Sequence, residues 1–431
     1  MTTVFCHPDL AMLPARSANV FPVLLYGLSD SNVHASIGNA ALPALRRLTK
    51  KTSIHSFDFL SIALAVTAAD TFVDRGDAPD RWCRNLNLVV ALHDPNPWIS
   101  VATELETALR FLTGDLWSLE FLTGGLPPPG INERRTALTI VIPRNTDSVA
   151  LFSGGLDSTI GVFDLLANGR NPLLVSHAYR GDAGIQTDLL QYMPRPVARF
   201  GANLHPLNLR DATSDITMRS RSFNFLALAA VGVSVVAETT HANSVPLIVP
   251  ENGFIALNAP LTPRRVGSLS TRTTHPYFLG VVQRVFDQVG IPATISNPYE
   301  FKTKGEMFRE CLNPLALQNA AAKTMSCSNW KRKGMACGRC VPCLIRRASF
   351  EFAGVADTSR YQTQLTQGAE LSDDLLAVQT AILRARAAPM RAIASRSGPL
   401  PIDAHLRSQY EGVVRRGLNE MESFLISLGI S

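Results

Sequence analysis

The sequence predicts an α/β protein built on a doubly wound parallel sheet, and two patterns lead to this prediction. From Ser148 onward, short apolar runs of strand length alternate with amphipathic stretches of helix length, as in parallel βαβ units. Two adjacent glycines, Gly154 and Gly155, stand where the first apolar run gives way to a helix. Because such sheets bind ligands beyond the carboxyl ends of their strands, we expect the functional site at that edge.

The 431 residues predict two or three domains, at roughly 150 residues per domain. A stretch rich in glycine and proline, residues 124–130, and a polar link at 144–147 precede the parallel-sheet pattern. We therefore expect an N-terminal α+β accessory domain at 1–146, the parallel-sheet domain with a cysteine cluster at 147–358, and a helical C-terminal extension at 359–431.

The individual elements are predicted from hydrophobic periodicity. In the N-terminal domain a strand is expected at 87–92 and a helix at 102–112. The strands of the parallel sheet are expected at 149–152, 172–176, 203–207, 245–249 and 293–296. Helices are expected at 158–166, 185–192, 222–238, 277–289 and 304–311, and in the C-terminal extension at 371–388 and 409–428.

Composition narrows the class of protein. The formal net charge of +6 comes from 41 Lys and Arg against 35 Asp and Glu, without a long run of one sign. This balance suits anionic nucleotides and makes a nucleic-acid partner unlikely. The start of the chain lacks a secretory signal pattern. The longest apolar stretch, near 223–237, is interrupted by Asn224 and falls short of the roughly 18 residues of a membrane span. We expect a cytoplasmic protein with no membrane partner.

A phosphate-binding loop is predicted between the first strand and helix of the parallel sheet. Adjacent glycines let the backbone approach an anion, and hydroxyls add donors to the free N–H groups of the first helical turn. Asp157 would repel phosphate unless a divalent cation lay between them, so we assign it to Mg²⁺ bridging the β and γ phosphates. The alternative is an ordinary strand-to-helix turn. The predicted phosphate-binding residues are Ser153, Gly154, Gly155, Leu156, Asp157, Ser158 and Thr159.

The hexapeptide from Ser153 to Ser158 resembles the Ser-Gly-Gly-x-Asp-Ser signature of the PP-loop superfamily of N-type ATP pyrophosphatases. The Gly-Lys-Ser or Gly-Lys-Thr of a Walker loop does not follow it. The resemblance implies an adenine nucleotide alpha hydrolase-like fold of the HUP type. It also implies cleavage of ATP between the α and β phosphates, transfer of AMP to a carboxylate or carbonyl oxygen, and displacement of that AMP by a nitrogen or sulfur nucleophile.

Four cysteines have the spacing C-x9-C-x2-C-x2-C, while Cys6, Cys83 and Cys311 lie apart. In a cytosolic chain such clustering indicates a metal rather than disulfides. Four thiolates at tetrahedral distance make a structural zinc site without an open position for catalysis. An iron–sulfur cluster or a redox pair remains the alternative. The predicted ligands are Cys327, Cys337, Cys340 and Cys343.

The longer pattern is similar to the 7-cyano-7-deazaguanine synthase (QueC) family. It is carried by Asn297-Pro298, Thr303-Lys304-Gly305-Glu306, Ser326-Cys327, the segment from Cys337 to Arg346, Phe350-Glu351, Gly354 and Asp357. With the phosphate loop, the resemblance covers residues 148–358. It implies that the protein converts 7-carboxy-7-deazaguanine and ammonia to an amide and then a nitrile with ATP, that Lys304 reaches the phosphates, and that the cysteines bind zinc.

Further candidate site residues lie outside the phosphate loop. Arg221 stands roughly where the family carries an Arg-Asn pair, although Ser222 replaces the asparagine. Arg221 is thus a catalytic candidate beside Asp157 and Lys304, and Arg219 is a substrate candidate, although both arginines equally suit a solvated helix start. Loops next to predicted core elements supply four more substrate candidates, of which the last equally suits a helix cap: Glu251, Asn252, Arg272 and His275.

The chain is about twice as long as the segment that carries the resemblance, residues 148–358. Long proteins of this layout occur in anti-phage defence operons, including the Qat system and type IV CBASS, and the chain resembles QatC proteins most. This implies a ligase that forms a C–N bond, activates a 7-deazaguanine carboxylate with ATP, and passes it to an amine on a QatB-like partner from the same operon. The alternatives are synthesis of free 7-cyano-7-deazaguanine in the queuosine pathway, a PP-loop tRNA-modifying enzyme, and an inactive ATP-binding scaffold.

Overall fold

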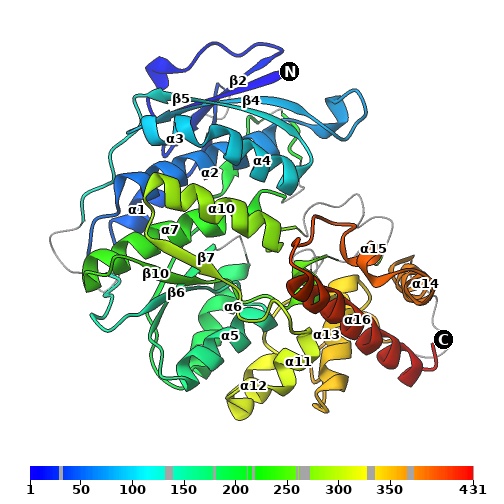
Figure 1. Cartoon of the computed structure of the whole chain (residues 1–431). Helices are drawn as coiled ribbons and strands as arrows, with labels where there is room; N and C mark the ends of the chain where they lie inside the picture. The colour runs from blue at the N-terminus through cyan, green and yellow to red at the C-terminus, as the bar shows by residue number, and fades with distance from the viewer. Residues whose placement is uncertain are drawn as a thin grey trace.

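Two sheets organise the computed structural model, which describes residues 1–28, 33–131, 139–177, 181–210, 212–215, 219–258, 261, 272–327, 335–365 and 373–430. One sheet has six strands in the order β5-β4-β1-β2-β3-β9, and the other has five in the order β11-β10-β6-β7-β8. Figure 1 shows the six-stranded sheet at the top, the five-stranded sheet below the central helices, and the C-terminal helices to one side.

The five-stranded sheet is parallel throughout, and its chain path reverses at β6. From β6 the chain proceeds to β7 and β8 on one side, then crosses back to β10 and β11 on the other. The switch point therefore lies between β6 and β10, where doubly wound sheets bind ligands. The strands are β6 (Ser148–Leu151), β7 (Pro172–His177), β8 (Arg199–Ala202), β10 (Val245–Ile248) and β11 (Ala293–Ser296).

Helices cover both faces of this sheet. One face carries α5 (Leu156–Ala167) and α6 (Asp182–Leu189), followed by the short helix η3 (Leu190–Tyr192); the other carries α7 (Arg221–Thr240) and α10 (Pro276–Val289) (Figure 1). The predicted α/β class with a parallel sheet is confirmed for this part.

The strand predicted at 203–207 is wrong. β8 ends at Ala202, and β9 (Pro206–Leu207) pairs antiparallel with β3 in the other sheet. Leu204 between them is fully buried without being in a strand. Its burial explains the misleading apolar signal, while the four residues of β8 are too few to show alternation.

The N-terminal part forms a parallel sheet rather than the expected α+β arrangement. Its strands are β1 (Thr2–His7), β2 (Val20–Leu25), β3 (Ala35–Ile37), β4 (Asn85–Leu92) and β5 (Leu116–Thr123), and all pairs among them are parallel. Parallel strands need crossover connections. These include α1 (Ala41–Leu45), α2 (Ile54–Phe72), α3 (Asn96–Ser100) and α4 (Ala102–Thr113), with short helices η1 (Leu10–Met12) and η2 (Arg75–Asp77).

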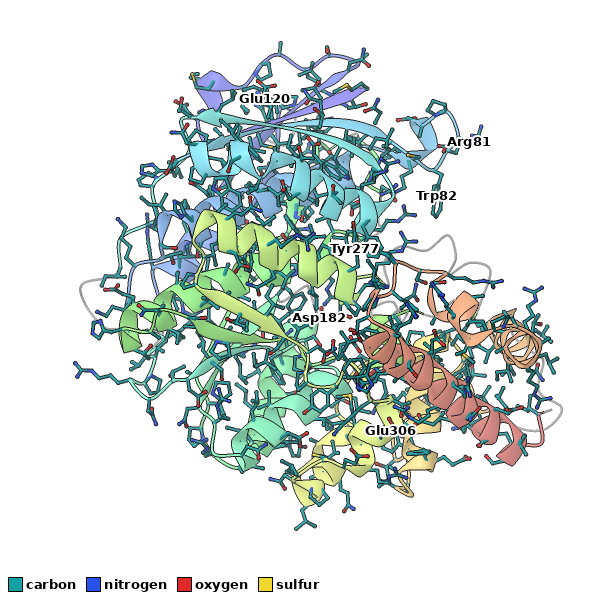
Figure 2. The ribbon with its side chains drawn as sticks, viewed as in Figure 1. Arg81, Trp82, Glu120, Asp182, Tyr277 and Glu306 are labelled. Carbon is teal, nitrogen blue, oxygen red and sulfur yellow. The ribbon has the colours of Figure 1, made fainter. Side chains whose placement is uncertain are left out.

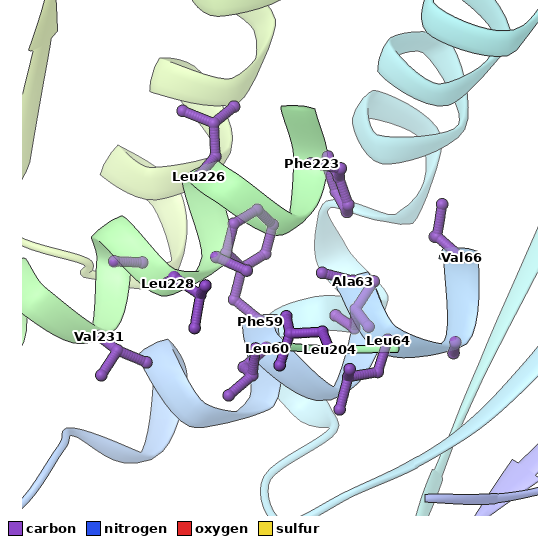
Figure 3. Close-up of a cluster of buried hydrophobic side chains, with 14 of the residues drawn as sticks. Phe59, Leu60, Ala63, Leu64, Val66, Leu204, Phe223, Leu226, Leu228 and Val231 are labelled. Carbon is purple, nitrogen blue, oxygen red and sulfur yellow. The ribbon is translucent and has the colours of Figure 1, made fainter. Parts of the chain in front are cut away.

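Helix α2 explains why the sequence pattern indicates an α+β fold for the N-terminal part although its strands are parallel. Nearly every one of its 19 residues is buried, so it lacks the polar face from which an amphipathic helix is recognised. Phe59 at its centre packs edge-on against Phe223 of α7 and Phe286 of α10, with ring centroids 5.0 Å apart in each case. Figure 3 shows Phe59 and Phe223 among the surrounding buried apolar side chains.

The two sheets thus share one continuous apolar core through α2, α4, α7 and α10. Helix α7 is long and apolar enough to cross a membrane by length and composition alone, but 78% of its most apolar window is buried inside the protein. Its hydrophobicity is therefore that of a core helix. The division at residues 146 and 147 remains a prediction, since the core runs across it.

The C-terminal part is helical. Helix α8 (Gly253–Ala256) follows β10, and α11 (Lys304–Arg309), α12 (Pro314–Ala321) and α13 (Val341–Phe352) follow β11. The C-terminal part after them consists of α14 (Asp373–Ala387), α15 (Met390–Ala394) and α16 (Ala404–Ser427). Helices α14 and α16 correspond to the predictions at 371–388 and 409–428, of which 371 and 372 lie outside the described residues. Helix α16 packs on α13, α8 and α11 (Figure 1).

Candidate active site

The loop between β6 and α5 is held by hydrogen bonds from Met325 and Gln186, while no side chain caps the N-terminus of α5. Gly154 has a φ of +81°, which favours glycine. Its carbonyl accepts a hydrogen bond from the Met325 amide at 3.0 Å, and Gln186 Nε2 donates to the Ser153 carbonyl at 3.3 Å. Gly155 occupies the N-cap position of α5, so no side chain caps the helix from there. The amides of the first turn are therefore available to an anion.

The loop hydroxyls stabilise the turn itself. Ser158 Oγ and Thr159 Oγ1 donate to the Gly155 carbonyl at 3.0 and 2.9 Å. Ser153 is exposed, and its oxygen accepts from the Gly155 amide at 3.3 Å and lies 3.2 Å from Ser158 Oγ. Contact of these hydroxyls with phosphate stays a prediction, as does that of the backbone at Leu156, the first residue of α5.

Four predicted residues meet at the switch point of the sheet. Asp157, at the start of α5, is buried and forms an ion pair with the buried Lys304 at the start of α11. Asn252 Nδ2 donates to Asp157 Oδ2 at 2.7 Å and to Glu251 Oε1 at 3.2 Å. Asn252 also caps α8 by accepting from the Ile255 amide at 3.0 Å. The ends of β6 and β10 and the start of α11 thus supply one polar cluster.

The protonation of this cluster follows from burial and charge. Burial by itself raises the pKa of Asp157, but the Lys304 ammonium and the surrounding hydrogen bonds outweigh burial and hold that pKa at about 2. Burial and then the negative charge of Asp157 raise the pKa of Glu251 well above its usual range. Two adjacent carboxyl groups facing one ammonium match the oxygen ligands that Mg²⁺ prefers.

Arg221 lies beside the phosphate loop through its contact with α6. Its Nη2 donates to Asp182 Oδ2 at 2.7 Å, and α6 also carries Gln186, which contacts the loop. One turn further along α7, Asn224 is fully buried, and neither side-chain amide atom hydrogen-bonds to a described residue. Asp182, Gln186 and Asn224 were missed from the sequence. The signal for Asn224 was its position as a polar residue in an apolar stretch.

Arg219 is directed to the N-terminal part of the protein. Its Nη1 donates to the Thr113 carbonyl at 2.9 Å, and its guanidinium lies 4.2 Å from the Trp82 ring centroid. Trp82 is 41% exposed, and Figure 2 shows it on a loop that projects from the N-terminal part. Burial, and to a smaller extent the neighbouring Arg75, lowers the pKa of Arg219 to about 10. These contacts position α7 against the N-terminal part, and a substrate role for Arg219 stays a prediction.

Arg272 and His275 also contact the N-terminal part. Arg272 Nη1 donates to the Phe111 carbonyl at 3.1 Å, and the His275 ring lies 5.1 Å from the Phe111 ring. His275 Nδ1 accepts from the Tyr277 amide at 3.2 Å, so this side chain is the N-cap of α10. Burial lowers the pKa of His275 to about 3, with a smaller effect of Arg272, and keeps the ring neutral. The rest of this predicted loop, 268–271, lies outside the described residues.

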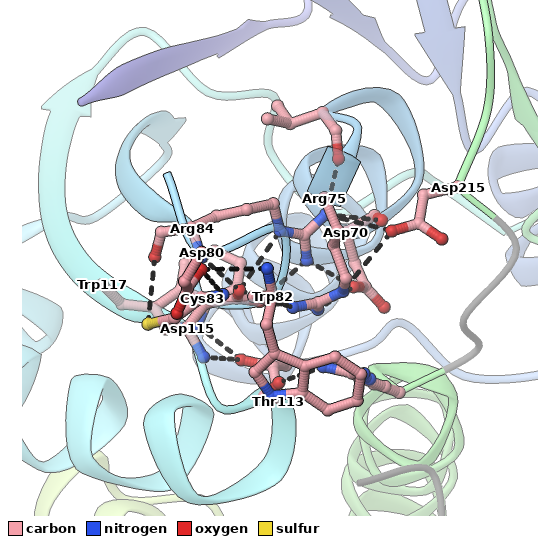
Figure 4. A network of polar contacts seen from close by, with 12 residues as sticks. Asp70, Arg75, Asp80, Trp82, Cys83, Arg84, Thr113, Asp115, Trp117 and Asp215 are labelled. Atoms are coloured by element: carbon pink, nitrogen blue, oxygen red, sulfur yellow. Dashed lines mark hydrogen bonds and ion pairs between the residues drawn. The ribbon is translucent and has the colours of Figure 1, made fainter. Parts of the chain in front are cut away.

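A buried ionic network fixes the start of α7 relative to the N-terminal part (Figure 4). Arg75 Nη1 contacts Asp115 Oδ1 at 2.6 Å, and Arg84 Nη2 contacts Asp70 Oδ1 and Asp115 Oδ2, each at 2.7 Å. Asp70 Oδ2 also accepts from the Ser220 amide at 3.1 Å. Because these charges are buried, each depends on its partners, and the network holds Ser220 rigidly.

The four cysteines converge as predicted. All four are buried, and their sulfur atoms lie within 4.8 Å of one another. The Sγ distances Cys327–Cys340 and Cys337–Cys343 are both 3.9 Å. A tetrahedron with Zn–S bonds of ~2.3 Å has sulfur atoms about 3.8 Å apart, so the arrangement fits zinc. Met325, two residues before the first ligand, hydrogen-bonds the phosphate loop.

About half of the chain is similar in sequence to 7-cyano-7-deazaguanine synthases. A 7-cyano-7-deazaguanine synthase of Thiobacillus denitrificans is 30% identical over 231 residues, which cover 50% of this chain and 97% of that protein. The synthase of Myxococcus xanthus is 25% identical over 237 residues, covering 50% and 96%. A shorter match to the synthase of Cupriavidus metallidurans is 58% identical over 40 residues, covering 9% and 18%. No family model matches the chain.

Proposed function

Because this chain belongs to the 7-cyano-7-deazaguanine synthase family, we propose that it is a ligase that activates a 7-deazaguanine carboxylate with ATP. The carboxylate oxygen attacks the α phosphorus, the bond between that phosphorus and the bridging oxygen of the β phosphate breaks, and pyrophosphate leaves. An amine then attacks the acyl carbon and expels AMP, which keeps one carboxylate oxygen. A C–N bond is thereby formed at the expense of one phosphoanhydride.

The observation that carries this proposal is the polar cluster at the switch point. The uncapped amides of α5 and the Lys304 ammonium converge where a triphosphate would meet the sheet edge. Preorganised charges of this kind stabilise a departing pyrophosphate. Mg²⁺ held by Asp157 and Glu251 would neutralise the β and γ phosphates. Zinc held by the four cysteines would staple the segment that contacts the loop through Met325.

We place the heterocycle of the substrate at the first turn of α7. Arg221 supplies a cation there, and the Asn224 amide offers one donor and one acceptor with no described partner. A buried amide without hydrogen bonds is unfavourable, so a ligand that pairs with both atoms would be favoured there. The lactam of a 7-deazaguanine has a matching acceptor and donor.

The test mixes purified protein, ATP, Mg²⁺ and 7-carboxy-7-deazaguanine and measures pyrophosphate and AMP. Wild type should release both, whereas Asp157→Ala should lose at least about 100-fold in rate, as removal of a key electrostatic contact does. Asp188→Ala removes the same charge from the exposed side of α6 and should behave like wild type. Equal rates for wild type and Asp157→Ala would refute the catalytic role. Nucleotide binding without turnover would favour an ATP-binding scaffold.

We further propose that the amine belongs to a QatB-like partner protein in an anti-phage setting in the cytoplasm. About half of the chain lies outside the two long matches, which suits added parts that position a macromolecular acceptor. The intact mass of the partner that supplies the amine should rise after co-expression by the mass of 7-carboxy-7-deazaguanine less one water, the gain that amide formation produces. Unchanged partner masses together with free amide or nitrile product would identify ammonia as the nucleophile.

A further inference from the structure

Helix α16 of the C-terminal part packs directly on the segments that carry the polar cluster. Gly417 lies against the Phe254 ring of α8, so closely that a Cβ on Gly417 would come within 2.4 Å of it. A Cβ on Gly253, the residue after Asn252, would meet Val413 of α16 at 3.3 Å and backbone even closer. The backbone that presents Asn252 is therefore shaped to the surface of α16.

The carboxylate of Glu420, on the same helix, contacts the residues immediately before and after Lys304. Glu420 is buried, and it accepts a hydrogen bond from the Thr303 hydroxyl and another from the Gly305 amide at 3.3 Å. A Cβ on Gly305 would lie 2.8 Å from the Glu420 carboxyl. The Thr303 oxygen in turn accepts from the Glu306 amide at 3.1 Å, which caps α11. Glu420 therefore orients the cap of the helix that begins with Lys304.

Further contacts fasten α11 and the preceding turn to α16. Arg416 Nε contacts Glu306 Oε1, and Arg416 Nη2 donates to the Phe301 carbonyl, both at 2.6 Å. The Tyr410 hydroxyl donates to Glu300 Oε2 at 2.9 Å. The segment from Glu300 to Glu306 is thus held by α16 at several points, and the Tyr410 and Glu420 side chains that contact it are both buried.

Such support matters because α11 has only six residues. A helix this short has little stability of its own in water. The ammonium group of a lysine is joined to the backbone by a flexible aliphatic chain. A poorly fixed backbone at Lys304 would therefore leave its ammonium poorly positioned. The backbone of Lys304 is accordingly fixed from outside the parallel-sheet domain.

We propose that Glu420 is a positioning residue that keeps the Lys304 ammonium on Asp157 by holding the first turn of α11. The C-terminal part is then a component of the phosphate site. The inference rests on the proposed function for its catalytic consequence, but its structural claim can be tested without turnover.

The test is competitive labelling of lysines with acetic anhydride, read by mass spectrometry and normalised to Lys50, whose side chain is 43% exposed. In wild type, Lys304 should react at least about tenfold more slowly than Lys302, whose side chain is 40% exposed. Glu420→Ala should raise the labelling of Lys304 several-fold and leave that of Lys302 unchanged. Glu420→Gln keeps the side-chain volume and one of the two acceptor oxygens, so it should give a smaller rise than Glu420→Ala.

Leu418→Ala is the matched control, since it removes a buried side chain of α16 that belongs to an apolar cluster without any residue of α11. It should destabilise the C-terminal part but leave Lys304 labelling at the wild-type level. The proposal is overturned if Glu420→Ala leaves Lys304 protected, if Leu418→Ala exposes it equally, or if Lys302 and Lys304 rise together, which would report local unfolding.

Turnover separates this inference from the proposed function. If wild type releases pyrophosphate, Glu420→Gln should lower the rate at saturating ATP by about 10- to 100-fold, as misplacement of a catalytic group by ~1 Å does. If wild type releases none, the proposed function fails, and the labelling result still decides whether Glu420 positions Lys304.

Discussion

Replacing Lys304 by methionine removes the ammonium that faces buried Asp157 while keeping an unbranched side chain. The side chains of Lys304 and Asp157 are 5% and 6% exposed, so solvent cannot take over the lost interaction. Breaking a buried ion pair from one side costs about 3 to 5 kcal/mol, because the remaining charge stays buried without compensation.

The double variant Asp157→Asn with Lys304→Met removes both charges and leaves neither one orphaned. Its loss of unfolding free energy should fall short of the sum of the two single losses by about 2 to 3 kcal/mol, at the upper end for contacting pairs. Lys302→Met is the matched control. It breaks a pair whose members are 40% and 44% exposed, and exposed pairs contribute at most about 1 kcal/mol.

The assay is urea unfolding at pH 7, followed by circular dichroism with zinc present throughout. Comparison of midpoints at a common slope gives the differences in unfolding free energy. Additive losses, or a loss for Lys304→Met no larger than that for Lys302→Met, would refute a coupled buried pair.

Three further predictions concern the metal, the heterocycle site and pH. Cys343→Ser should lose one zinc per chain and unfold the cysteine segment locally, as metal analysis and proteolysis would show; retained zinc or bound iron would contradict the assignment. Asn224→Leu should leave the unfolding free energy unchanged or raise it by up to about 1 kcal/mol, yet weaken binding of 7-carboxy-7-deazaguanine at least tenfold by calorimetry, and unchanged affinity would remove Asn224 from the site. Burial raises the pKa of Glu420 from 4.5 to about 7, against the opposing hydrogen bonds from Thr303 and Gly305. The folded state therefore binds the Glu420 proton more tightly than the unfolded state does. The resulting stabilisation of the folded state is fully present below pH 4.5 and is lost as the pH rises through 7. Glu420→Gln should abolish this dependence, worth about 3 kcal/mol between those limits, and identical pH profiles of unfolding would contradict it.

Local signals explain what could be predicted from the sequence. The adjacent Gly154 and Gly155 stand between a strand and a helix, and the cysteine spacing is compact, so each motif is readable within a short window. Glu251 and Asn252 follow a strand whose carboxyl end lies at the switch point, which topology alone brings to Asp157.

Other features depend on contacts between distant segments, which leave no local pattern. Glu420 is one acidic residue in an amphipathic helix, and its contact with Thr303 spans 117 residues. His275 and Arg272 look like loop residues, but the fold turns both toward Phe111. Helix α2 is buried on nearly all sides, so its sequence lacks the amphipathic period by which a helix is recognised. Without that helix, the crossover connections that make the N-terminal strands parallel could not be predicted.

Transfer of oxygen from substrate to nucleotide tests the central claim most directly. The substrate is 7-carboxy-7-deazaguanine with ¹⁸O in its carboxylate, supplied with ATP, Mg²⁺ and ammonia, and the AMP formed is examined by mass spectrometry. An acyl adenylate requires AMP that carries one ¹⁸O, because the carboxylate oxygen bonded to phosphorus departs with it. Unlabelled AMP, or ADP and phosphate in its place, would contradict adenylation at this loop.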